Sequence, residues 1–351
     1  LLILCCIVNN KIMANVLVIR LSAFGDVAML VPPLYSVAKA YPNDTFYVLT
    51  NKNFVLLFDL GLSNIHPIGV DLADYKGIKG LFRLGNFLRK YDIDKVADVH
   101  DVLRSKFLRT YFAFLGKKTV HIDKGRKEKR AVISHKVPLQ PLKHTIDRYK
   151  NVFEAMGYVA EMSFSHYFSN VSGEIALPEN IFLNESKKNI GIAPFAKHKA
   201  KMYPLEKMEQ VINNLCTRSD IVIYLFGSQN EAEILERWQT KYDNVVCIAG
   251  KLNLAQELFL MSQLRVMLSM DSANMHLASL VGVPVISIWG ATHPYLGFYG
   301  FRQSIDDAVQ IDLDCRPCSV FGNKPCRRGD YACLNYIDSD IVIQQLQKHL
   351  D

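Results

Sequence analysis

One carboxylate stands at a position suited to catalysis. Residues 16–30 read VLVIRLSAFGDVAML, in which the apolar run from Val16 to Ile19 is typical of a buried strand and Asp26 opens the next apolar segment after a short loop. An aspartate at such a turn has two interpretations: a helix cap that accepts first-turn N–H groups, or a general base at the mouth of a cleft. Pro32 and Pro33 weaken a regular helix from this point, so capping alone is a less complete explanation.

A second stretch has the pattern of a phosphate-binding turn. Residues 265–294 predict a strand that ends at Met270, then the cap-forming Asp271 and Ser272, and then a short helix that begins at Ala273. The free N–H groups of that first turn, with the positive helix end behind them, favour an anion, to which His276 in the same turn could donate. An ordinary capped turn with a solvent-facing histidine is the alternative.

Two further loops carry charges that suit a nucleotide. The loop after residues 189–195 holds four basic residues, which suit a diphosphate but are equally typical of a solvated loop: Lys197, His198, Lys199 and Lys201. After residues 221–226, Glu231 and Glu233 are placed to hold ribose hydroxyls, although acidic residues also favour a helix start.

Four cysteines form a separate cluster. The spacing Cys315-x2-Cys318-x7-Cys326-x6-Cys333 allows a structural zinc site, while reduced thiols are the favoured alternative and disulfides a lesser one. The sequence contains no Walker-type phosphate loop, no G-x-G-x-x-G and no dense Asp-x-Asp pair. We therefore expect no catalytic metal and no required cofactor.

The elements that position these residues alternate between strand and helix along nearly the whole chain. At 351 residues the chain is long enough for two domains, and the alternation predicts two doubly wound α/β domains with ligands at the carboxyl ends of their strands. The expected boundaries are 13–170 for the first domain, 171–188 for a linker, 189–337 for the second domain and 338–351 for a final helix.

Positive charge points to an acidic partner. The net charge is +7; residues 117–130 are basic, residues 143–148 add Lys143, His144 and Arg148, and the strand end at 98–105 adds Asp98, His100, Asp101, Arg104 and Ser105. This concentration in the first domain suits an anionic acceptor or a negatively charged membrane face. Solvated surface is the alternative. The apolar stretch Leu1–Val8 is too short to span a bilayer. We expect Met13 to be the true start and residues 1–12 to be upstream translation, with a membrane-touching segment as the minority hypothesis. No transmembrane helix is expected, and without a secretory signal the scattered cysteines suggest the reducing cytoplasm.

Three motifs in the right order resemble the lipopolysaccharide heptosyltransferase family, glycosyltransferase family 9. They are VLVIRLSAFGDVAMLVPPLYSVAKAYP, VADVHDVLRSKFL and SMDSANMHLASLVGVPVISIWGATHP, and HTIDRY near residue 144 also fits. The resemblance implies a GT-B fold with two Rossmann-like domains facing a central cleft, the N-terminal domain binding the acceptor and the C-terminal domain a nucleotide-diphosphate sugar. It also implies inverting, metal-independent transfer.

The resemblance assigns roles to individual residues. Asp26 matches the catalytic base, Lys201 the group that neutralises the diphosphate, and Asp271, Ser272, Ala273 and His276 the phosphate-binding turn, while Glu231 or Glu233 would hold the ribose. The acceptor-binding residues expected on the basic loops are Ser22, Arg104, Lys124, Arg126, Lys129 and Arg148. Ala273 stands where the family has glycine, so we expect donor binding to persist but the identity of the donor to be less secure.

The resulting hypothesis is a glycosyltransferase that moves a sugar, in this family heptose from ADP-heptose, to a lipopolysaccharide-core or related glycan acceptor. Its expected partners are the nucleotide sugar, an anionic glycolipid or glycan and the inner membrane surface, with no nucleic acid, at a cytoplasmic location. The alternatives are a sugar-nucleotide epimerase or hydrolase of the same fold and a non-catalytic nucleotide-sugar-binding protein.

Overall fold

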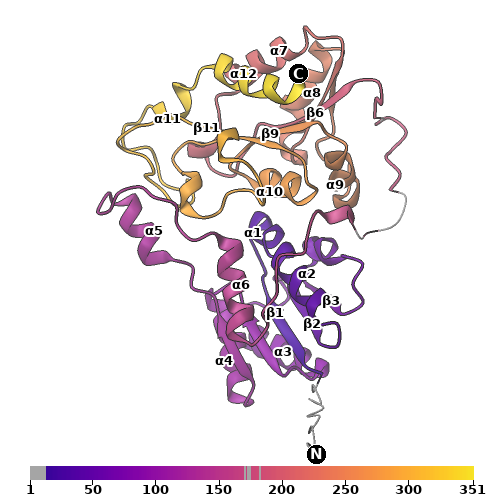
Figure 1. Ribbon diagram of the computed structural model, residues 1–351, viewed down its shortest axis with the longest axis vertical. Helices are drawn as coiled ribbons and strands as arrows, with labels where there is room; N and C mark the ends of the chain where they lie inside the picture. The colour runs from indigo at the N-terminus through magenta and orange to yellow at the C-terminus, as the bar shows by residue number, and fades with distance from the viewer. Residues whose placement is uncertain (1–12, 170, 172–174, 182) are drawn as a thin grey trace, which may run out of the picture. The chain divides into compact units, whose positions relative to one another are not determined.

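The computed structural model describes residues 13–351 except 170, 172–174 and 182 (Figure 1). The chain divides into two compact units: unit 1 runs up to Ser22 and includes residues 34–122 and 151–161, and unit 2 comprises residues 23–33, 123–150 and 162–351. The expected origin of residues 1–12, and the predicted linker at 172–174 and 182, lie outside the described residues.

The described residues of unit 1 form a parallel five-stranded sheet in the order β3-β2-β1-β4-β5. Its strands are β1 (Asn15–Ile19), β2 (Thr45–Asn51), β3 (Ile65–Val70), β4 (Lys95–Asp98) and β5 (Lys118–His121). On one face, α3 (Gly77–Leu88) and α4 (Leu103–Phe114) pack their apolar sides against β1 and β4, with Leu84, Leu108 and Phe112 in the core. The sheet therefore buries near-continuous apolar strands, as parallel sheets require.

In unit 2 the described residues form a parallel six-stranded sheet in the order β11-β10-β9-β6-β7-β8. Its strands are β6 (Lys188–Ala193), β7 (Ile221–Leu225), β8 (Val245–Cys247), β9 (Val266–Met270), β10 (Val285–Ile288) and β11 (Ala308–Val309). The direction of winding reverses between the neighbours β6 and β9. Open α/β sheets bind ligands beyond the carboxyl ends of the strands at such a switch point.

The helices of unit 2 cover this sheet and close the chain. Those on the sheet include α7 (Leu205–Leu215), α8 (Ala232–Lys241), α9 (Leu254–Ser262), α10 (Ala273–Leu280), α11 (Ala332–Asn335) and α12 (Ser339–Leu350). Helix α5 (Arg126–Ile133) belongs to the same unit but contributes no residue to the core around this sheet. The last helix packs Leu346 and Leu350 into the core beside α7. Helix α6 (Thr145–Ala155) and helix α2 (Val31–Ala40) each contribute residues to both units.

The segment around Asp26 shows the expected break. Helix α1 (Phe24–Ala28) ends after five residues, and α2 begins at Val31 with Pro32 and Pro33 in its first turn. Proline is tolerated there because first-turn N–H groups lack intrahelical partners in any case. Asp26 therefore lies on a short helix of its own.

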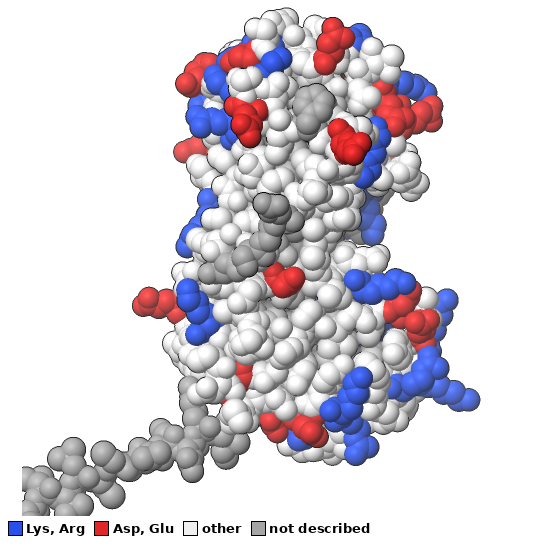
Figure 2. All heavy atoms as spheres, turned by 90° about the vertical axis from the view of Figure 1, so that its right-hand side faces the viewer, with Lys and Arg blue, Asp and Glu red and all other residues white. Residues whose placement is uncertain are grey.

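The surface carries mixed charge. Figure 2 shows one face of the molecule, on which charged side chains stand singly or in groups of both signs between broad uncharged areas. Among the residues described, no helix combines the length and the apolar character needed to cross a bilayer.

The burial of α12 yields a stability test. Leu346→Ala is expected to lower the free energy of unfolding by about 2–5 kcal/mol, because the fully buried Leu346 side chain would leave a cavity. Ile341→Ala, at an exposed position on the same helix, should change it by less than about 0.5 kcal/mol. Urea denaturation measures both, and equal losses would contradict the packing of α12 described above.

Candidate active site

The predicted phosphate-binding turn is present at the switch point of unit 2. β9 ends at Met270, and α10 begins at Ala273 with Ser272 as its N-cap in extended conformation. The Ser272 side chain makes no capping hydrogen bond; its hydroxyl lies 3.2 Å from that of Ser269 instead. The first-turn N–H groups of α10 are thus not consumed by a side-chain cap, which leaves them available to an anion.

Beside this turn, a lysine and a threonine converge on a buried aspartate. The Asp271 carboxylate is only 3% exposed; its Oδ2 lies 2.9 Å from Lys201 Nζ and accepts a 2.7 Å hydrogen bond from the Thr292 hydroxyl. These side chains follow three neighbouring strands, β6, β9 and β10, so the contacts join the loops at the carboxyl edge of the sheet. A buried carboxylate requires such compensation.

Two residues that were not predicted from the sequence support the loops of this network. The buried Arg316 donates hydrogen bonds to the carbonyl oxygens of Gly290 (2.6 Å) and Thr292 (3.0 Å), and so fixes the loop after β10. Gly322, at φ +72°, lies against the Lys201 side chain: a Cβ there would come within 2.5 Å of Lys201 Cγ. Thr292 lies in the recognised GATHP block, but nothing local signals Arg316 or Gly322.

Arg316 and Gly322 belong to the cysteine-rich segment. Its four cysteines are free thiols, and burial raises the pKa of Cys333 to about 11. Within the described residues, no group of three or more His, Cys, Asp or Glu side chains is arranged to hold a metal ion. Structural zinc at this cluster stays a prediction. The observed contribution of the segment is to pack against the Lys201 loop.

Asp26 lies in the same compact unit as the phosphate-binding turn. Its backbone carbonyl accepts a 3.1 Å hydrogen bond from the Tyr149 hydroxyl, and its carboxylate accepts a long 3.4 Å bond from the Ala23 N–H at the start of α1. The preceding Gly25 rests on the imidazole of His276: a Cβ there would come within 2.4 Å of the ring. Helices α1 and α10 are thus in direct contact, and capping accounts for Asp26 only weakly.

His276 is buried rather than solvent-facing. Burial lowers its pKa to about 4, and the nearby carboxylates of Asp271 and Asp26 offset only part of that effect. Its Nδ1 atom is buried and has no hydrogen-bond partner among the described residues. The ring therefore stays neutral at pH 7, and any contribution to anion binding comes from a neutral donor rather than a cation.

The two glutamates differ in position. Glu231 lies beyond the carboxyl end of β7, where its Oε2 accepts hydrogen bonds from the Ser228 N–H (2.6 Å) and hydroxyl (2.9 Å). Glu233 is 80% exposed on α8 and pairs with Arg237 one turn away. Only Glu231 lies at the edge of the sheet that bears the phosphate-binding turn.

The expected acceptor-binding residues are divided between the units. Ser22 and Arg104 belong to unit 1, where the Ser22 hydroxyl lies 3.5 Å from His100 Nε2. The others belong to unit 2: Lys124, Arg126, Lys129 and Arg148.

Arg148 has a clear structural task. It is buried, and its guanidinium donates to the carbonyls of Lys143 and Asp123 and to Glu128 at 2.8 Å. It thereby fixes the turn that begins α5. Contact with an acceptor stays a prediction for all six residues.

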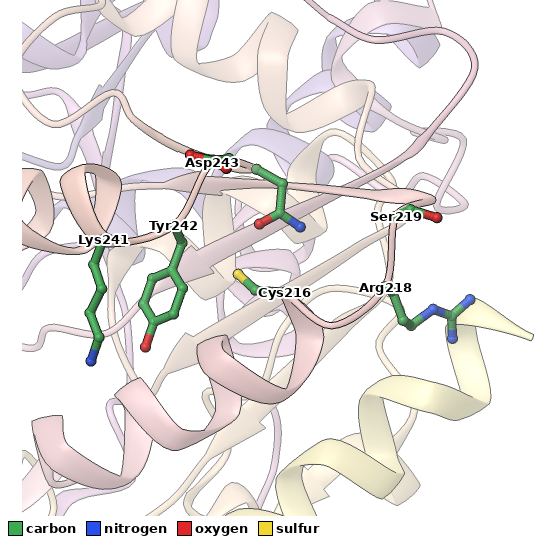
Figure 3. A pocket seen from close by; sticks show the side chains of 7 residues that line it. Cys216, Arg218, Ser219, Lys241, Tyr242 and Asp243 are labelled. Carbon is green, nitrogen blue, oxygen red and sulfur yellow. The ribbon is translucent and has the colours of Figure 1, made fainter.

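A surface pocket in unit 2 lies at the opposite edge of the sheet. It is lined by residues at the amino ends of β7 and β8, among them Cys216, Arg218, Lys241 and Tyr242 (Figure 3). Arg218 already pairs with Asp220, and Lys241 with Glu209. The pocket therefore lies at the edge of the sheet opposite the candidate phosphate-binding turn, and its cations are engaged in surface ion pairs.

Comparison with known proteins decides the family. The sequence profile described as glycosyltransferase family 9 (heptosyltransferase) matches residues 81–324. The chain belongs to glycosyltransferase family 9. It is accordingly a glycosyltransferase of the heptosyltransferase type.

Similar family 9 proteins match along most of the chain. Lipopolysaccharide heptosyltransferase 1 of Pseudomonas aeruginosa is 24% identical, with 87% of this chain and 86% of the relative covered. A family 9 glycosyltransferase from Veillonella parvula has a TM-score of 0.74 at 19% identity (96% and 97% covered). Escherichia coli heptosyltransferase WaaC, solved with ADP, has a TM-score of 0.68 at 19% identity (95% and 99% covered). The predicted GT-B class with two Rossmann-like domains is confirmed.

Lys201 should be essential for nucleotide binding. Lys201→Ala is expected to weaken ADP binding about 10- to 100-fold, because a charge-assisted contact to the diphosphate is lost and Asp271 is left undercompensated. Lys348→Ala, at an exposed position on α12, is the control and should leave the Kd unchanged. Isothermal titration with ADP measures both, and an unchanged Kd for Lys201→Ala would remove Lys201 from the site.

The depressed pKa of His276 makes stability depend on pH. As the pH is lowered from 6.5 to about 4, His276 takes up a proton in the unfolded chain but not in the folded protein. The free energy of unfolding should therefore decrease over this range, by up to about 3 kcal/mol from this residue. In His276→Leu that part of the slope should disappear, whereas His121→Leu, at an exposed position, should retain it. Urea denaturation across this pH range distinguishes them; identical slopes in all three proteins would contradict the burial of His276.

Proposed function

We propose that this family 9 member transfers heptose from ADP-heptose to a lipopolysaccharide-core or related glycan acceptor, with inversion at the anomeric carbon and without a catalytic metal. Asp26 serves as the general base, and Lys201 with the first turn of α10 receives the diphosphate. We place the reaction in the cytoplasm, at the cytoplasmic face of the inner membrane. The observation that carries the proposal is the contact of Gly25 with His276, which joins the Asp26 helix to the phosphate-binding helix.

The proposed reaction is a single displacement. The acceptor hydroxyl loses its proton to the Asp26 carboxylate as its oxygen forms a bond to the anomeric carbon of the sugar. The bond from that carbon to the diphosphate oxygen breaks on the opposite face, and ADP leaves with the bonding electrons. Attack and departure on opposite faces invert the configuration.

Leaving-group stabilisation falls to groups already present in the chain. Lys201 Nζ, 2.9 Å from Asp271 Oδ2, supplies a full positive charge, and the N-terminus of α10 supplies a partial one. Charge that develops on the diphosphate is met by these groups, which supports the proposal that no metal is needed. Ala273 leaves this turn usable because a residue at a helix start has negative φ, where alanine costs little.

The choice of nucleotide and sugar follows from the family. The family is described as heptosyltransferase, and the E. coli relative was solved with ADP. Glu231, with one carboxylate oxygen committed to Ser228, offers the other to the ribose hydroxyls. The family model, described as heptosyltransferase, favours transfer over the epimerase or hydrolase alternative.

Asp26→Asn should separate catalysis from binding. We expect kcat to fall by about 10²- to 10⁴-fold, because the amide cannot accept the acceptor proton, while ADP binding remains within about two-fold of wild type. Asp59→Asn, at an exposed position in unit 1, is the matched control and should keep full activity.

The assay follows heptose transfer from ADP-heptose to a deacylated lipopolysaccharide-core oligosaccharide, with EDTA present throughout. Near wild-type transfer by Asp26→Asn would refute the base assignment. Release of ADP without a glycosylated product would favour the hydrolase alternative. Activity that appears only when excess Mg²⁺ or Mn²⁺ replaces the EDTA would refute metal independence.

A further inference from the structure

Unit 1 exposes an apolar strip on two packed helices. On α4, Leu103, Phe107, Tyr111 and Phe114 recur at helical spacing along one side, and Leu103 and Phe114 are each 88% exposed. On α3, Ile78 and Phe82 are also exposed. Single exposed apolar residues are ordinary, but a continuous strip marks an interaction surface. We call these six residues the α3–α4 ridge.

The two helices form one surface because their aromatic side chains interlock. The Phe82 ring lies edge-on to Phe107 at 4.9 Å and to Tyr111 at 6.2 Å between centroids. The Tyr111 hydroxyl donates a 2.6 Å hydrogen bond to Asn86 of α3, and Gly85 allows the Tyr111 ring to approach closely. The two helices contact each other, and Figure 1 draws both in its lower part.

The ridge is surrounded by positive charge. Residues 76–91 and 102–122 each contain five Lys or Arg and no Asp or Glu. Three of these cations pair with acids elsewhere in unit 1: Lys106, Arg109 and Lys117. The remaining seven form no ion pair within the part of the chain that the structure describes, and they are Lys76, Lys79, Arg83, Arg89, Lys90, Arg104 and Lys118.

We propose that the α3–α4 ridge docks unit 1 onto an anionic lipid bilayer. Exposed Phe, Leu and Ile side chains would enter the boundary between headgroups and acyl chains, while the unpaired Lys and Arg side chains bind lipid phosphates. A surface with this many uncompensated cations and no acid within the two segments complements a negative membrane. The inference rests on the proposed function, because a lipid-linked acceptor would be presented at such a membrane.

Vesicle binding tests the surface directly. The full chain is mixed with vesicles of equal parts phosphatidylglycerol and phosphatidylcholine, or of phosphatidylcholine alone, and sedimented. We expect binding to the anionic vesicles that is at least roughly tenfold stronger than to the neutral ones and that weakens in about 0.5 M NaCl. Equal binding to both compositions would overturn the proposed role of charge.

Variants locate the contact. Phe82→Ser combined with Phe114→Ser should weaken binding roughly tenfold, and Lys79→Gln combined with Lys118→Gln by about five-fold per charge. The matched controls lie in unit 2: Phe321→Ser, at a position 64% exposed, and Arg237→Gln should bind like wild type. All variants share residues 1–12, so that apolar segment contributes equally to each measurement.

The remaining outcomes separate this inference from the proposed function. Wild-type binding by both ridge variants would overturn the docking surface. Self-association that the Phe82/Phe114 variant abolishes, without vesicle binding, would identify the ridge as a contact between copies and also overturn it. Ridge variants should retain transfer to the deacylated, water-soluble acceptor. Absence of that transfer in the wild type, with vesicle binding intact, would refute the proposed function and leave the surface standing.

Discussion

A buried negative charge organises the donor side of this protein. The Asp271 carboxylate lies at the end of a central strand, where water cannot solvate it, so its placement requires a cation and a hydroxyl nearby. Lys201 and Thr292 meet that requirement from the loops after the two strands that flank β9. Their convergence ties three loops together and holds an ammonium group close to the positive end of α10. One electrostatic constraint thus shapes the edge of the sheet and prepares it for a diphosphate.

The cysteine-rich segment contacts the same two loops that compensate Asp271. Its sequence suggests an independent metal-held excursion, yet its middle serves the donor loops: Arg316 binds the carbonyls of the Thr292 loop, and Gly322 lies flat against Lys201. A side chain at residue 322 would displace the lysine, and loss of the Arg316 guanidinium would leave several buried carbonyls without donors. The segment is therefore packed against the candidate phosphate-binding site, whatever the state of its thiols.

Most of the fold was predictable because local patterns dominate it. The buried strands were predictable as apolar runs, and the final helix, predicted within 338–351, spans Ser339–Leu350. β3 was not predicted, because Pro67 and Gly69 interrupt its apolar pattern, which an edge strand tolerates. β11 was not predicted, because a strand of two residues is too short to show an alternating pattern. In the candidate site, the motif residues could be named from the sequence and their roles stay predictions, whereas the contacts of Arg316 and the burial of Arg148 could not be foreseen. A sequence shows the charge of an arginine and not what its guanidinium binds.

Asp26 lies in the compact unit that also contains the candidate phosphate-binding turn. By chain position it belongs to the first α/β half, and the resemblance to family 9 places it across a cleft from the donor. The structure groups residues 23–33 with unit 2, where Gly25 contacts His276 and Tyr149 holds the Asp26 carbonyl. The geometry between the proposed base and the phosphate-binding turn is therefore set by packing within one compact unit. That packing requires a residue without a side chain at 25 and a neutral, buried ring at 276, because a Cβ or a hydrated imidazolium would separate α1 from α10. Unit 1 contains neither of these two helices; what it exposes is the α3–α4 ridge among unpaired cations.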